Sequence, residues 1–389
     1  MPGRSAVVVG GGIGGLAAAI ALHRLGWRVT VLERAGEFTE IGAGLSLWPN
    51  AMRALEVLGV ADAVGGVAAV ETGGGLRDRA GRWLLRLDNA EIARRHGRPL
   101  MVIHRADLVR TLVDALPAEV LRPGREVHAV RRDGATAVVE HGEETIRADL
   151  VVAATGLNSE LRRQWWPDSP APRYVGCTAW RMVSEPLPRL RADGAVYLGR
   201  GERAGFTRLT GGRFYCFGAA AVPVGGAEAA GGEYAEMLRR FGDWPDPIPA
   251  LLAAVPPDRL LRHDVYDLPP LPTYVHGRAV LLGDAAHPMD PILGQGACQA
   301  LEDAATLGAC LGAAPDVDSA LAGYDRLRRP RTQAIARRSA RIGAVTMWSS
   351  SPAVLARGLA ARLIPAGAGL RAMESVLGWR PPMAEGVWS

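Results

Sequence analysis

The chain has 389 residues, of which 48% are hydrophobic and 22% charged, and its formal net charge is +5. This composition predicts a soluble globular protein with a large core and more than one domain. The charges are dispersed and no apolar run is long enough to span a membrane, so neither nucleic-acid binding nor membrane insertion is expected. The first apolar run begins near Ser5 and leaves no room for a signal peptide, which favours a cytoplasmic location.

The absence of lysine and the spacing of the cysteines limit the reactions and binding sites that the sequence can provide. All 45 basic residues are arginine, because the sequence contains no lysine. This excludes a Walker A phosphate loop and Schiff-base or pyridoxal-phosphate chemistry, which need a lysine amine. The cysteines are scattered without metal-ligand spacing, so we expect no metal site and four buried free thiols, Cys177, Cys216, Cys298 and Cys310.

The N-terminal stretch has the pattern of a dinucleotide-binding βαβ unit. An apolar strand, 6–9, precedes the glycines of 10–15, a helix over 16–25 follows, and a second strand, 28–32, ends at Glu33. Gly10 allows the tight turn, Gly12 lets the backbone approach a pyrophosphate, and Gly15 lets the helix pack closely on the sheet. The helix N-terminus offers free N–H groups to phosphates, and Glu33 is placed to bind ribose hydroxyls. The motif alone does not distinguish NAD from FAD.

The next hundred residues are predicted to leave the first domain and then to return to it. A glycine-rich loop over 41–50 leads into a helix over 51–58. Short strands over 67–72 and 82–87 suggest an excursion out of the first domain. The chain returns with a strand near 101–105, a helix over 106–116, and three short strands before an almost wholly apolar strand at 149–154, which is typical of a buried parallel sheet.

Residues 171–268 form a second block of different composition. Strands over 174–183, 195–198, 206–209 and 213–219 predict a mostly antiparallel sheet, and a helix follows over 232–241. Because side chains alternate along a strand, half of the aromatic residues are expected to face one side of this sheet. They are Trp180, Tyr197, Phe206, Phe214, Tyr215 and Phe217.

A last apolar strand, 278–282, ends in the longest motif of the chain. This motif is Gly283-Asp284-Ala285-Ala286-His287-Pro288, followed by Pro291 and by Gly294-Gln295-Gly296. A helix over 297–311 comes next, and the remainder is expected to be helical with breaks at Pro330, Pro352 and Pro365. An acid at the carboxyl end of a parallel strand lies where ligands bind in α/β folds.

Three motifs together resemble the signatures of the FAD-dependent aromatic hydroxylases. These class A, single-component flavoprotein monooxygenases include para-hydroxybenzoate hydroxylase and salicylate hydroxylase. The motifs are Gly10–Gly15, Thr155-Gly156 with Ser159 and Arg162, and Gly283-Asp284 with Pro291 and Gly294-Gln295-Gly296. The resemblance runs from Val7 to about Arg338, and the third motif is the most specific.

The resemblance implies tightly bound FAD, NAD(P)H as a transient co-substrate, and O2. Asp284 would bind the ribityl chain, the loop after Pro291 would lie against the flavin ring, and the following helix would point its N-terminus at the ring. Glu33 would bind the adenosine ribose. The full expected FAD site is Gly10, Gly12, Ile13, Gly14, Gly15, Glu33, Arg34, Gly44, Leu45, Arg105, Thr155, Gly156, Gly283, Asp284, Pro291, Leu293, Gly294, Gln295 and Gly296.

The chain departs from the family pattern at Thr155, where the family has aspartate before the glycine. That aspartate is associated with the FAD pyrophosphate and with the reducing nicotinamide. Threonine still forms hydrogen bonds but carries no charge. We therefore expect FAD binding to survive and NAD(P)H use to be altered.

The implied reaction is transfer of one oxygen atom from a flavin C4a-hydroperoxide to an electron-rich aromatic or polyketide-like molecule, by hydroxylation or epoxidation. The protein would position the substrate and exclude water, with Arg181 and Pro291 placed at flavin and substrate and no obligatory acid or base. Two alternatives stay open, an FAD oxidase or reductase and a non-enzymatic flavin-binding protein. Expected substrate contacts are Trp48, Arg181, Tyr215, Phe217 and Asp290, although Asp290 is better interpreted as a solvated loop acid.

The expected fold is α/β, with a discontinuous Rossmann-like FAD-binding domain and an inserted β-sheet domain. The FAD-binding domain takes residues 1–66, 100–170 and 269–330. The substrate-binding sheet takes residues 67–99 and 171–268, and a helical segment, 331–389, packs on the FAD-binding domain. The sequence leaves open whether the protein is a monomer or a homodimer.

Overall fold

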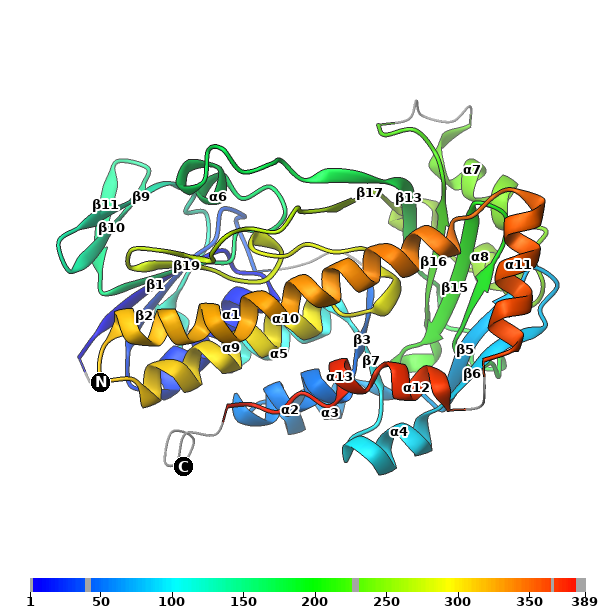
Figure 1. The fold of residues 1–389 in the computed structure, drawn as a ribbon, viewed down its shortest axis with the longest axis horizontal. Coiled ribbons are helices and arrows are strands. Elements are labelled where there is room, and N and C mark those ends of the chain that lie inside the picture. The colour runs from blue at the N-terminus through cyan, green and yellow to red at the C-terminus, as the bar shows by residue number, and fades with distance from the viewer. Residues whose placement is uncertain (1–2, 39–42, 226–230, 365–366, 383–389) are drawn as a thin grey trace.

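The computed structural model describes residues 3–38, 43–225, 231–364 and 367–382 of the chain. Figure 1 shows a Rossmann-like half and a large antiparallel sheet at opposite ends of the molecule, with the long helix α10 (Val317–Thr346) running along both. The expected α/β fold with an added antiparallel sheet is confirmed. Pro365 lies outside the described residues.

The Rossmann-like half is built on a six-stranded sheet. Its order is β18-β19-β12-β1-β2-β8, parallel throughout except for the pairing of β18 with β19. The central strands are almost wholly apolar and buried, as a sheet covered on both faces requires. The six strands are β1 (Ser5–Val9), β2 (Arg28–Leu32), β8 (Leu121–Arg122), β12 (Leu150–Ala153), β18 (Val275–His276) and β19 (Ala279–Leu281).

Helices and two small sheets surround this core. Helix α1 (Ile13–Arg24) and helix α9 (Gly296–Ala313) pack on each other, and α10 packs on α9. The other helices are α2 (Pro49–Val57), α3 (Ala61–Val67), α4 (Asn89–His96), α5 (Arg105–Asp114) and α6 (Glu160–Trp165). The small sheets are β11-β10-β9 and β3-β7-β4, formed by β9 (Val127–Asp133), β10 (Thr136–His141), β11 (Glu144–Ala148), β3 (Gly44–Leu47), β4 (Ala69–Val70) and β7 (Met101–His104).

The second half is a seven-stranded sheet of order β17-β13-β16-β15-β14-β5-β6. Most neighbouring pairs are antiparallel, and β14 with β5 is parallel. The strand expected over 67–72 is largely wrong, because the glycine-rich segment that follows it forms the strand instead. The strands are β5 (Gly73–Asp78), β6 (Trp83–Asp88), β13 (Arg173–Val183), β14 (Ala195–Leu198), β15 (Glu202–Arg208), β16 (Phe214–Ala220) and β17 (Leu261–Asp267).

The two faces of this sheet have different neighbours. Trp180, Tyr197, Phe206 and Phe214 join a core under α7 (Gly232–Phe241) and α8 (Ile248–Ala253). Tyr215 and Phe217 alternate with buried neighbours and line a cavity on the opposite face. The aromatic residues thus lie on both faces of the sheet, four on one face and two on the other rather than half on each.

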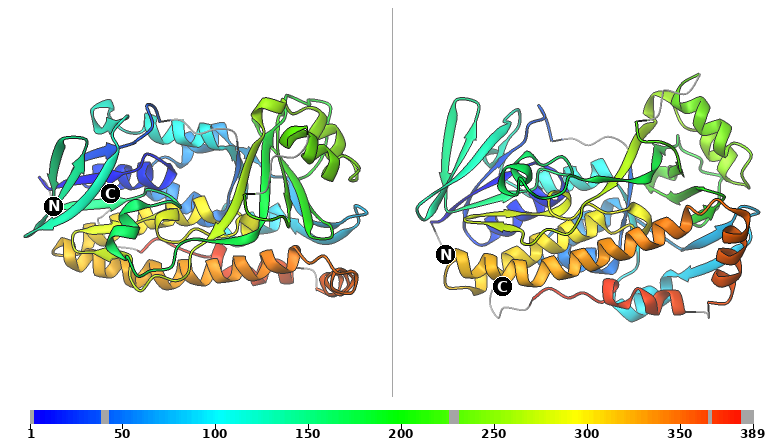
Figure 2. Two further views of the ribbon diagram at one scale, coloured as in Figure 1. Left: turned by 90° about the horizontal axis from the view of Figure 1, so that it is seen from above. Right: turned by 45° about the horizontal axis from the view of Figure 1, so that its top comes forward.

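The C-terminal helices contact both halves of the molecule (Figure 2). Helices α11 (Ser351–Arg362) and α12 (Ala368–Ala372) lie against β6, whereas α13 (Glu374–Leu377) lies against α2. The described part of residues 331–382 therefore does not pack on the Rossmann-like half alone. The break expected at Pro330 is wrong, because α10 continues through it with its buried side held against α9. Pro352 lies in the first turn of α11, where proline is tolerated.

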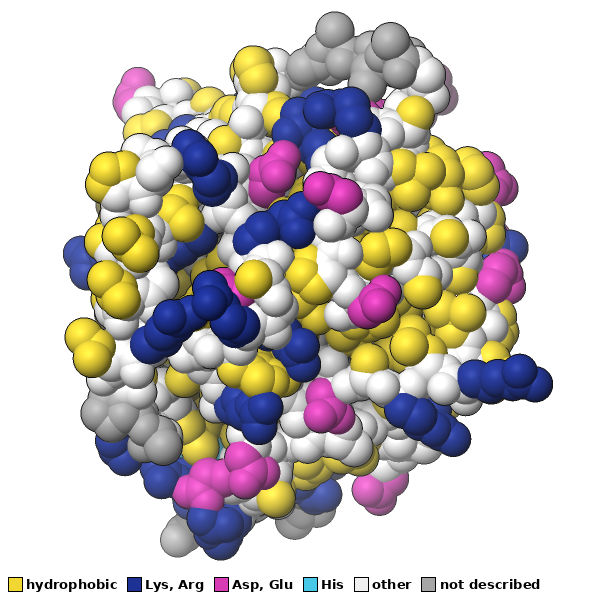
Figure 3. All heavy atoms as spheres, turned by 90° about the vertical axis from the view of Figure 1, so that its right-hand side faces the viewer, with side chains coloured by type: hydrophobic (Ala, Val, Ile, Leu, Met, Phe, Trp, Pro, Cys, Tyr) yellow, Lys and Arg dark blue, Asp and Glu magenta, His cyan; other side chains and the backbone are white. Residues whose placement is uncertain are grey.

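Exposed hydrophobic side chains gather at one end of the molecule. Figure 3 looks onto the end of the molecule that carries α11, where hydrophobic side chains lie between arginines. Leu355, Leu359 and Leu363 of this region are exposed. None of the described helices has the length and apolarity needed to cross a membrane. Three of the four free cysteines are buried as expected, and Cys310 is only partly buried.

Candidate functional site

A cavity of about 670 Å³ runs between the Rossmann-like half and the seven-stranded sheet. It begins at the glycines after β1, passes Glu33 and Asp284, and ends against β15, β14 and β5. The structure brings together along its walls almost every residue expected at the site from the sequence. Three of those residues do not line it, namely Gly15, Asp290 and Gln295.

The glycine turn after β1 has the geometry expected of a pyrophosphate site. Gly10 has φ +104°, and a Cβ there would lie 2.4 Å from the carbonyl oxygen of Ala154. A Cβ at Gly15 would lie 1.9 Å from the carbonyl oxygen of Gly10, which is the close packing expected of this position. Gly12 is the N-cap of α1, and within the described chain no side chain caps that helix end. Free N–H groups and the positive end of α1 therefore face the cavity.

Glu33 is fixed at the end of β2. Its Oε2 accepts a hydrogen bond from the Gly11 backbone N–H at 2.6 Å, and its Oε1 accepts one from Ala35 N–H at 2.8 Å. These bonds orient the carboxylate at the cavity wall beside Arg34. The position suits an acceptor for ribose hydroxyls.

The second motif, Thr155-Gly156 with Ser159 and Arg162, connects two turns of the site. Thr155 Oγ1 donates to Ser159 Oγ at 2.5 Å, and that hydroxyl caps α6 by accepting from Arg162 N–H at 3.1 Å. The buried Arg162 guanidinium donates to Ala285 O at 2.9 Å and Leu157 O at 2.6 Å. Burial, with a smaller contribution from Arg163, lowers the pKa of Arg162 to about 10. Arg162 thus connects the threonine turn to the turn that carries Asp284.

Asp284 points into the cavity rather than capping a helix. It is exposed, and its Oδ1 lies 4.0 Å from the position that a Cβ would take on Gly296, the first residue of α9. Arg105 lies near Asp284, and Arg181 lies near Arg105. Burial lowers the pKa of Arg105, the Asp284 carboxylate opposes that shift, and Arg181 adds to it.

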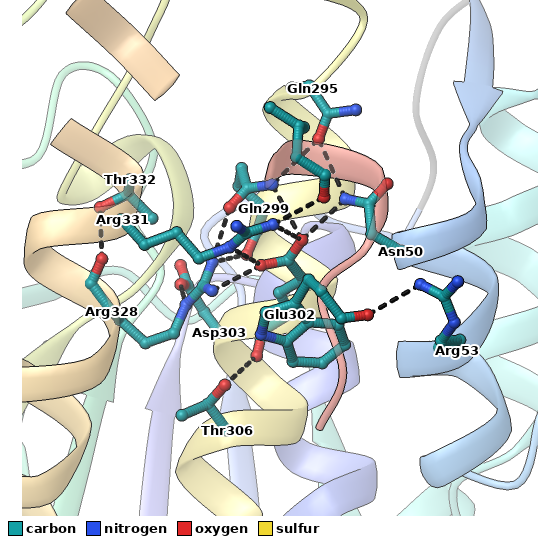
Figure 4. Close-up of polar contacts among 12 residues, drawn as sticks. Asn50, Arg53, Gln295, Gln299, Glu302, Asp303, Thr306, Arg328, Arg331 and Thr332 are labelled. Atoms are coloured by element: carbon teal, nitrogen blue, oxygen red, sulfur yellow. Dashed lines mark hydrogen bonds and ion pairs between the residues drawn. The ribbon is translucent and has the colours of Figure 1, made fainter. Parts of the chain in front are cut away.

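A buried polar network lies behind the turn that carries Asp284 and behind the loop before α9. Figure 4 shows the part of it that joins Asn50, Gln295, Gln299, Glu302, Asp303 and Arg328. Asp303 Oδ2 accepts from the Gly283 backbone N–H at 3.0 Å and contacts His287 Nε2 at 2.6 Å. Arg328 of α10 donates to Asp303 at 2.6 Å and to Glu302 at 2.5 Å. Burial would raise the pKa of Asp303, but the charges of His287 and Arg328 outweigh it and hold that pKa below its usual value.

Gln295 belongs to this network. Its side chain is fully buried and accepts from Asn50 at 3.0 Å and from Gln299 at 2.9 Å, so it faces α2 and α9 rather than the cavity. The neighbouring Gly294 and Gly296 line the cavity. Gln295 therefore stabilises the loop through its hydrogen bonds to Asn50 and Gln299. Its side chain does not line the cavity in which the cofactor is expected.

Asp290 is not the solvated loop acid expected from the sequence. Its side chain is 4% exposed and lies 3.2 Å from the guanidinium of Arg203, which is 2% exposed. Asp290 also accepts from Ile292 N–H at 2.8 Å, while its backbone oxygen accepts from Ser339 at 2.6 Å. Arg203 of β15 lines the cavity and Asp290 does not, so the placement of Asp290 as a substrate contact is corrected.

One row of paired residues crosses the face of the seven-stranded sheet that lines the cavity. Arg181 pairs with Phe217, Phe217 with Gly205, Gly205 with Val196, and Val196 with Leu76. A Cβ at Gly205 would lie 2.6 Å from the Phe217 ring, so the glycine leaves room for that ring. The row runs from a cation at one end to aliphatic side chains at the other.

Tyr215 lies beside this row and meets the Rossmann-like half. A Cβ on Gly44 would lie 2.4 Å from Tyr215 Cβ, which shows how closely β16 approaches β3. Burial raises the pKa of Tyr215, and the charge of Arg181 partly opposes the shift. The phenol is therefore neutral at ordinary pH and available as a hydrogen-bonding group.

The polar residues of the cavity wall that sequence reasoning missed include two buried charged ones, Arg203 and Glu71. Glu71 is a single charged residue in a stretch of small and apolar residues, whereas Arg203 follows Arg200 and Glu202 and has no distinguishing signal in the sequence. Their burial depends on strands distant in sequence, because Arg203 meets Asp290 and Glu71 meets Thr207.

Comparisons with known proteins agree with this geometry. A family model described as an FAD binding domain matches residues 4–197 and 271–339. The chain is 37% identical over 352 residues to the aurachin C monooxygenase/isomerase of Stigmatella aurantiaca, covering 90% of this chain and 91% of that protein. It is 36% identical over 350 residues to the 3-amino-4-hydroxybenzoate 2-monooxygenase of Streptomyces cremeus, covering 86% of each.

A solved structure is similar over nearly the whole chain. The Klebsiella pneumoniae protein HpxO, crystallised with FAD and uric acid, has a TM-score of 0.89 and 29% identity, with 97% of each chain covered. The chain therefore belongs to the FAD-binding-domain family of flavoprotein monooxygenases, and the resemblance inferred from the motifs is confirmed. It is an FAD-dependent monooxygenase that acts on a small aromatic-type substrate.

Proposed function

We propose that this monooxygenase uses NAD(P)H and O2 to hydroxylate or epoxidise a planar, largely apolar aromatic or polyketide-like molecule. The observation that carries the proposal is the continuous cavity, which joins a dinucleotide-type glycine turn to a chamber walled by Phe217, Val196 and Leu76. Aromatic and aliphatic walls with few polar groups suit such a molecule.

The residues present fit FAD. A Cβ at Gly14 would lie 2.6 Å from the Leu282 side chain, so this end of the cavity depends on bare backbone. The buried indole N–H of Trp48, beside Gly294, has no hydrogen-bond partner within the described part of the chain. Bound FAD would supply electron transfer from NAD(P)H and activation of O2.

The roles proposed for the chain's own residues follow from their positions. The α1 N-terminus and Glu33 would bind the adenosine diphosphate part, and Asp284 would bind the ribityl hydroxyls. The α9 N-terminus, opened by Gly296, would favour negative charge at the ring edge that it faces. Arg181 and Tyr215 would orient the substrate, and the Pro291 loop with the sheet would exclude water from the chamber.

The reaction is tested with purified FAD-bound protein and a panel of phenols, aminobenzoates, quinolones and polycyclic aromatics. We expect substrate-dependent NAD(P)H oxidation and a product heavier by one oxygen atom derived from labelled O2. Hydrogen peroxide as the sole product with every compound would instead identify an oxidase-like activity and contradict the proposal.

Asp284→Ala is expected to weaken FAD binding about 10- to 100-fold, because a hydrogen bond to a charged group contributes about 1.5–3 kcal/mol and 1.4 kcal/mol is tenfold. The measurement is the fluorescence of flavin released on dilution. The matched control is Asp114→Ala, which removes an exposed carboxylate at the end of α5, outside the cavity. Equal FAD retention by the two variants would contradict the ribityl assignment.

A further inference from the structure

Glu71 lies between β4 and β5 in the chain and meets Thr207 of β15 and Gly194 at the cavity wall. Its side chain lines the cavity and the residue is only 8% exposed. The backbone is fixed, because Glu71 N–H donates to Leu100 O at 3.1 Å and Glu71 O accepts from the Asn89 side-chain amide. The direction of the carboxylate is therefore set by the fold.

Three neutral groups donate to the Glu71 carboxylate, namely the Thr207 hydroxyl and the backbone N–H groups of Gly194 and Thr72. Thr207 Oγ1 donates to Oε2, and Gly194 N–H donates to Oε1 at 3.3 Å. Within the described chain no ion pair is formed by this carboxylate. Burial raises the pKa of Glu71, while Thr207 and Gly194 oppose the shift and Asp193 adds a smaller upward contribution. Each carboxylate oxygen retains capacity to accept a further hydrogen bond.

The other buried carboxylates of the described chain behave differently. Asp267, Asp290, Glu302 and Asp303 are each paired with an arginine and none of them lines the cavity. A desolvated carboxyl without a cation is costly unless something else binds it. A group of this kind in a ligand cavity is a typical recognition site.

The residues that line the cavity around Glu71 define which kind of ligand can bind there. Val196, Leu76 and Leu87 line the cavity nearby, so a ligand there is apolar apart from the atom that faces the carboxylate. Thr207 pairs with Tyr215 across β15 and β16, which places Glu71 along the same wall as the expected substrate contacts.

We propose that Glu71 binds the substrate directly, by accepting a hydrogen bond from an N–H or O–H group on an otherwise apolar aromatic ring. The inference rests on the proposed function and deepens it. It assigns the substrate to phenols and N–H heteroaromatic compounds, held with that donor directed at the β4–β5 junction.

The test measures binding to the oxidised FAD-bound enzyme, without turnover, from the change in flavin absorbance. Two matched probe pairs are used, 2-naphthol with 2-methoxynaphthalene and 4-quinolone with N-methyl-4-quinolone. In each pair the second probe lacks the donor. The wild-type protein is expected to bind the donor probe of at least one pair about tenfold more tightly, as for a hydrogen bond to a charged acceptor.

Glu71→Gln is expected to abolish or reverse this preference, since its amide NH2 offers a donor where the carboxylate accepted. The control is Asp193→Asn, an exposed neighbour outside the cavity, which should keep the preference. A variant that has only distorted the chamber would weaken both probes of a pair equally and leave the ratio unchanged.

Two results would overturn the proposal. One is an unchanged preference in Glu71→Gln, and the other is a wild-type protein that shows no preference, including one that responds to none of the four probes. Failure of the oxygenation screen with a preference that depends on Glu71 would refute the proposed reaction but not this recognition site. The reverse combination would refute the site alone.

Discussion

Arg328→Met is expected to lower the free energy of unfolding by about 3–5 kcal/mol, because it leaves two buried carboxylates without their shared cation. Arg328 is 1% exposed and bonds Glu302, Asp303 and Gln299 together. Burial would lower its pKa, but the charges of Glu302 and Asp303 outweigh this and raise it. The expected loss is a large part of the 5–15 kcal/mol that stabilises a typical domain.

Chemical denaturation of the FAD-bound protein, followed by flavin and tryptophan fluorescence, measures this effect. The control is Arg329→Met, one residue along α10, whose side chain is 32% exposed and pairs with Asp325 at 3.1 Å. A partly exposed pair of this kind contributes about 1 kcal/mol or less. If the two variants lose similar stability, the network is not what holds α9 and α10 together.

The same network fixes the loop before α9 and the turn that carries Asp284. Glu302 accepts from Asn50 at 2.7 Å and Asp303 accepts from Gly283 N–H at 3.0 Å, so one helix face anchors both. We therefore expect Arg328→Met to release FAD at denaturant concentrations below the unfolding midpoint, whereas Arg329→Met should lose both signals together.

The parts of the site that the sequence predicted are those encoded by local spacing. The turn after β1, Glu33 at the end of β2 and the Asp284 motif each depend on neighbours within a few residues. Short-range patterns of this kind constrain the backbone directly, which is why the family resemblance was confirmed.

The parts that were missed depend on pairings between distant strands. The sequence predicts a solvated acid at Asp290, because nothing near it in sequence indicates that Arg203 of β15 would bury it. The groups that surround the Glu71 carboxylate come from Gly194, which precedes β14, and from Thr207 of β15. Pro330 stays helical because α9 holds the adjoining turns through Arg328 and Arg331, a contact that local propensity does not include.

The close packing of α1 on the sheet predicts that a substitution at Gly15 also has a large effect on stability. Gly15→Ala is expected to cost about 3–5 kcal/mol and to abolish FAD retention, at the upper end for single substitutions. The added Cβ would lie 1.9 Å from Gly10 O and 3.3 Å from Ala154 Cβ, so backbone rather than a flexible side chain would have to move. Moving α1 away from β1 would displace the N–H groups that face the cavity.

The matched control is Gly65→Ala, also in a helix, where a Cβ would meet nothing within 4 Å. Since alanine favours helix over glycine by about 1 kcal/mol, this variant should be as stable as the wild type or slightly more stable. FAD content after purification and the denaturation midpoint are compared for both variants. A Gly15→Ala protein that retained FAD as well as Gly65→Ala would show that α1 can shift on the sheet without losing the pyrophosphate site, and the proposed role of this helix end would be wrong.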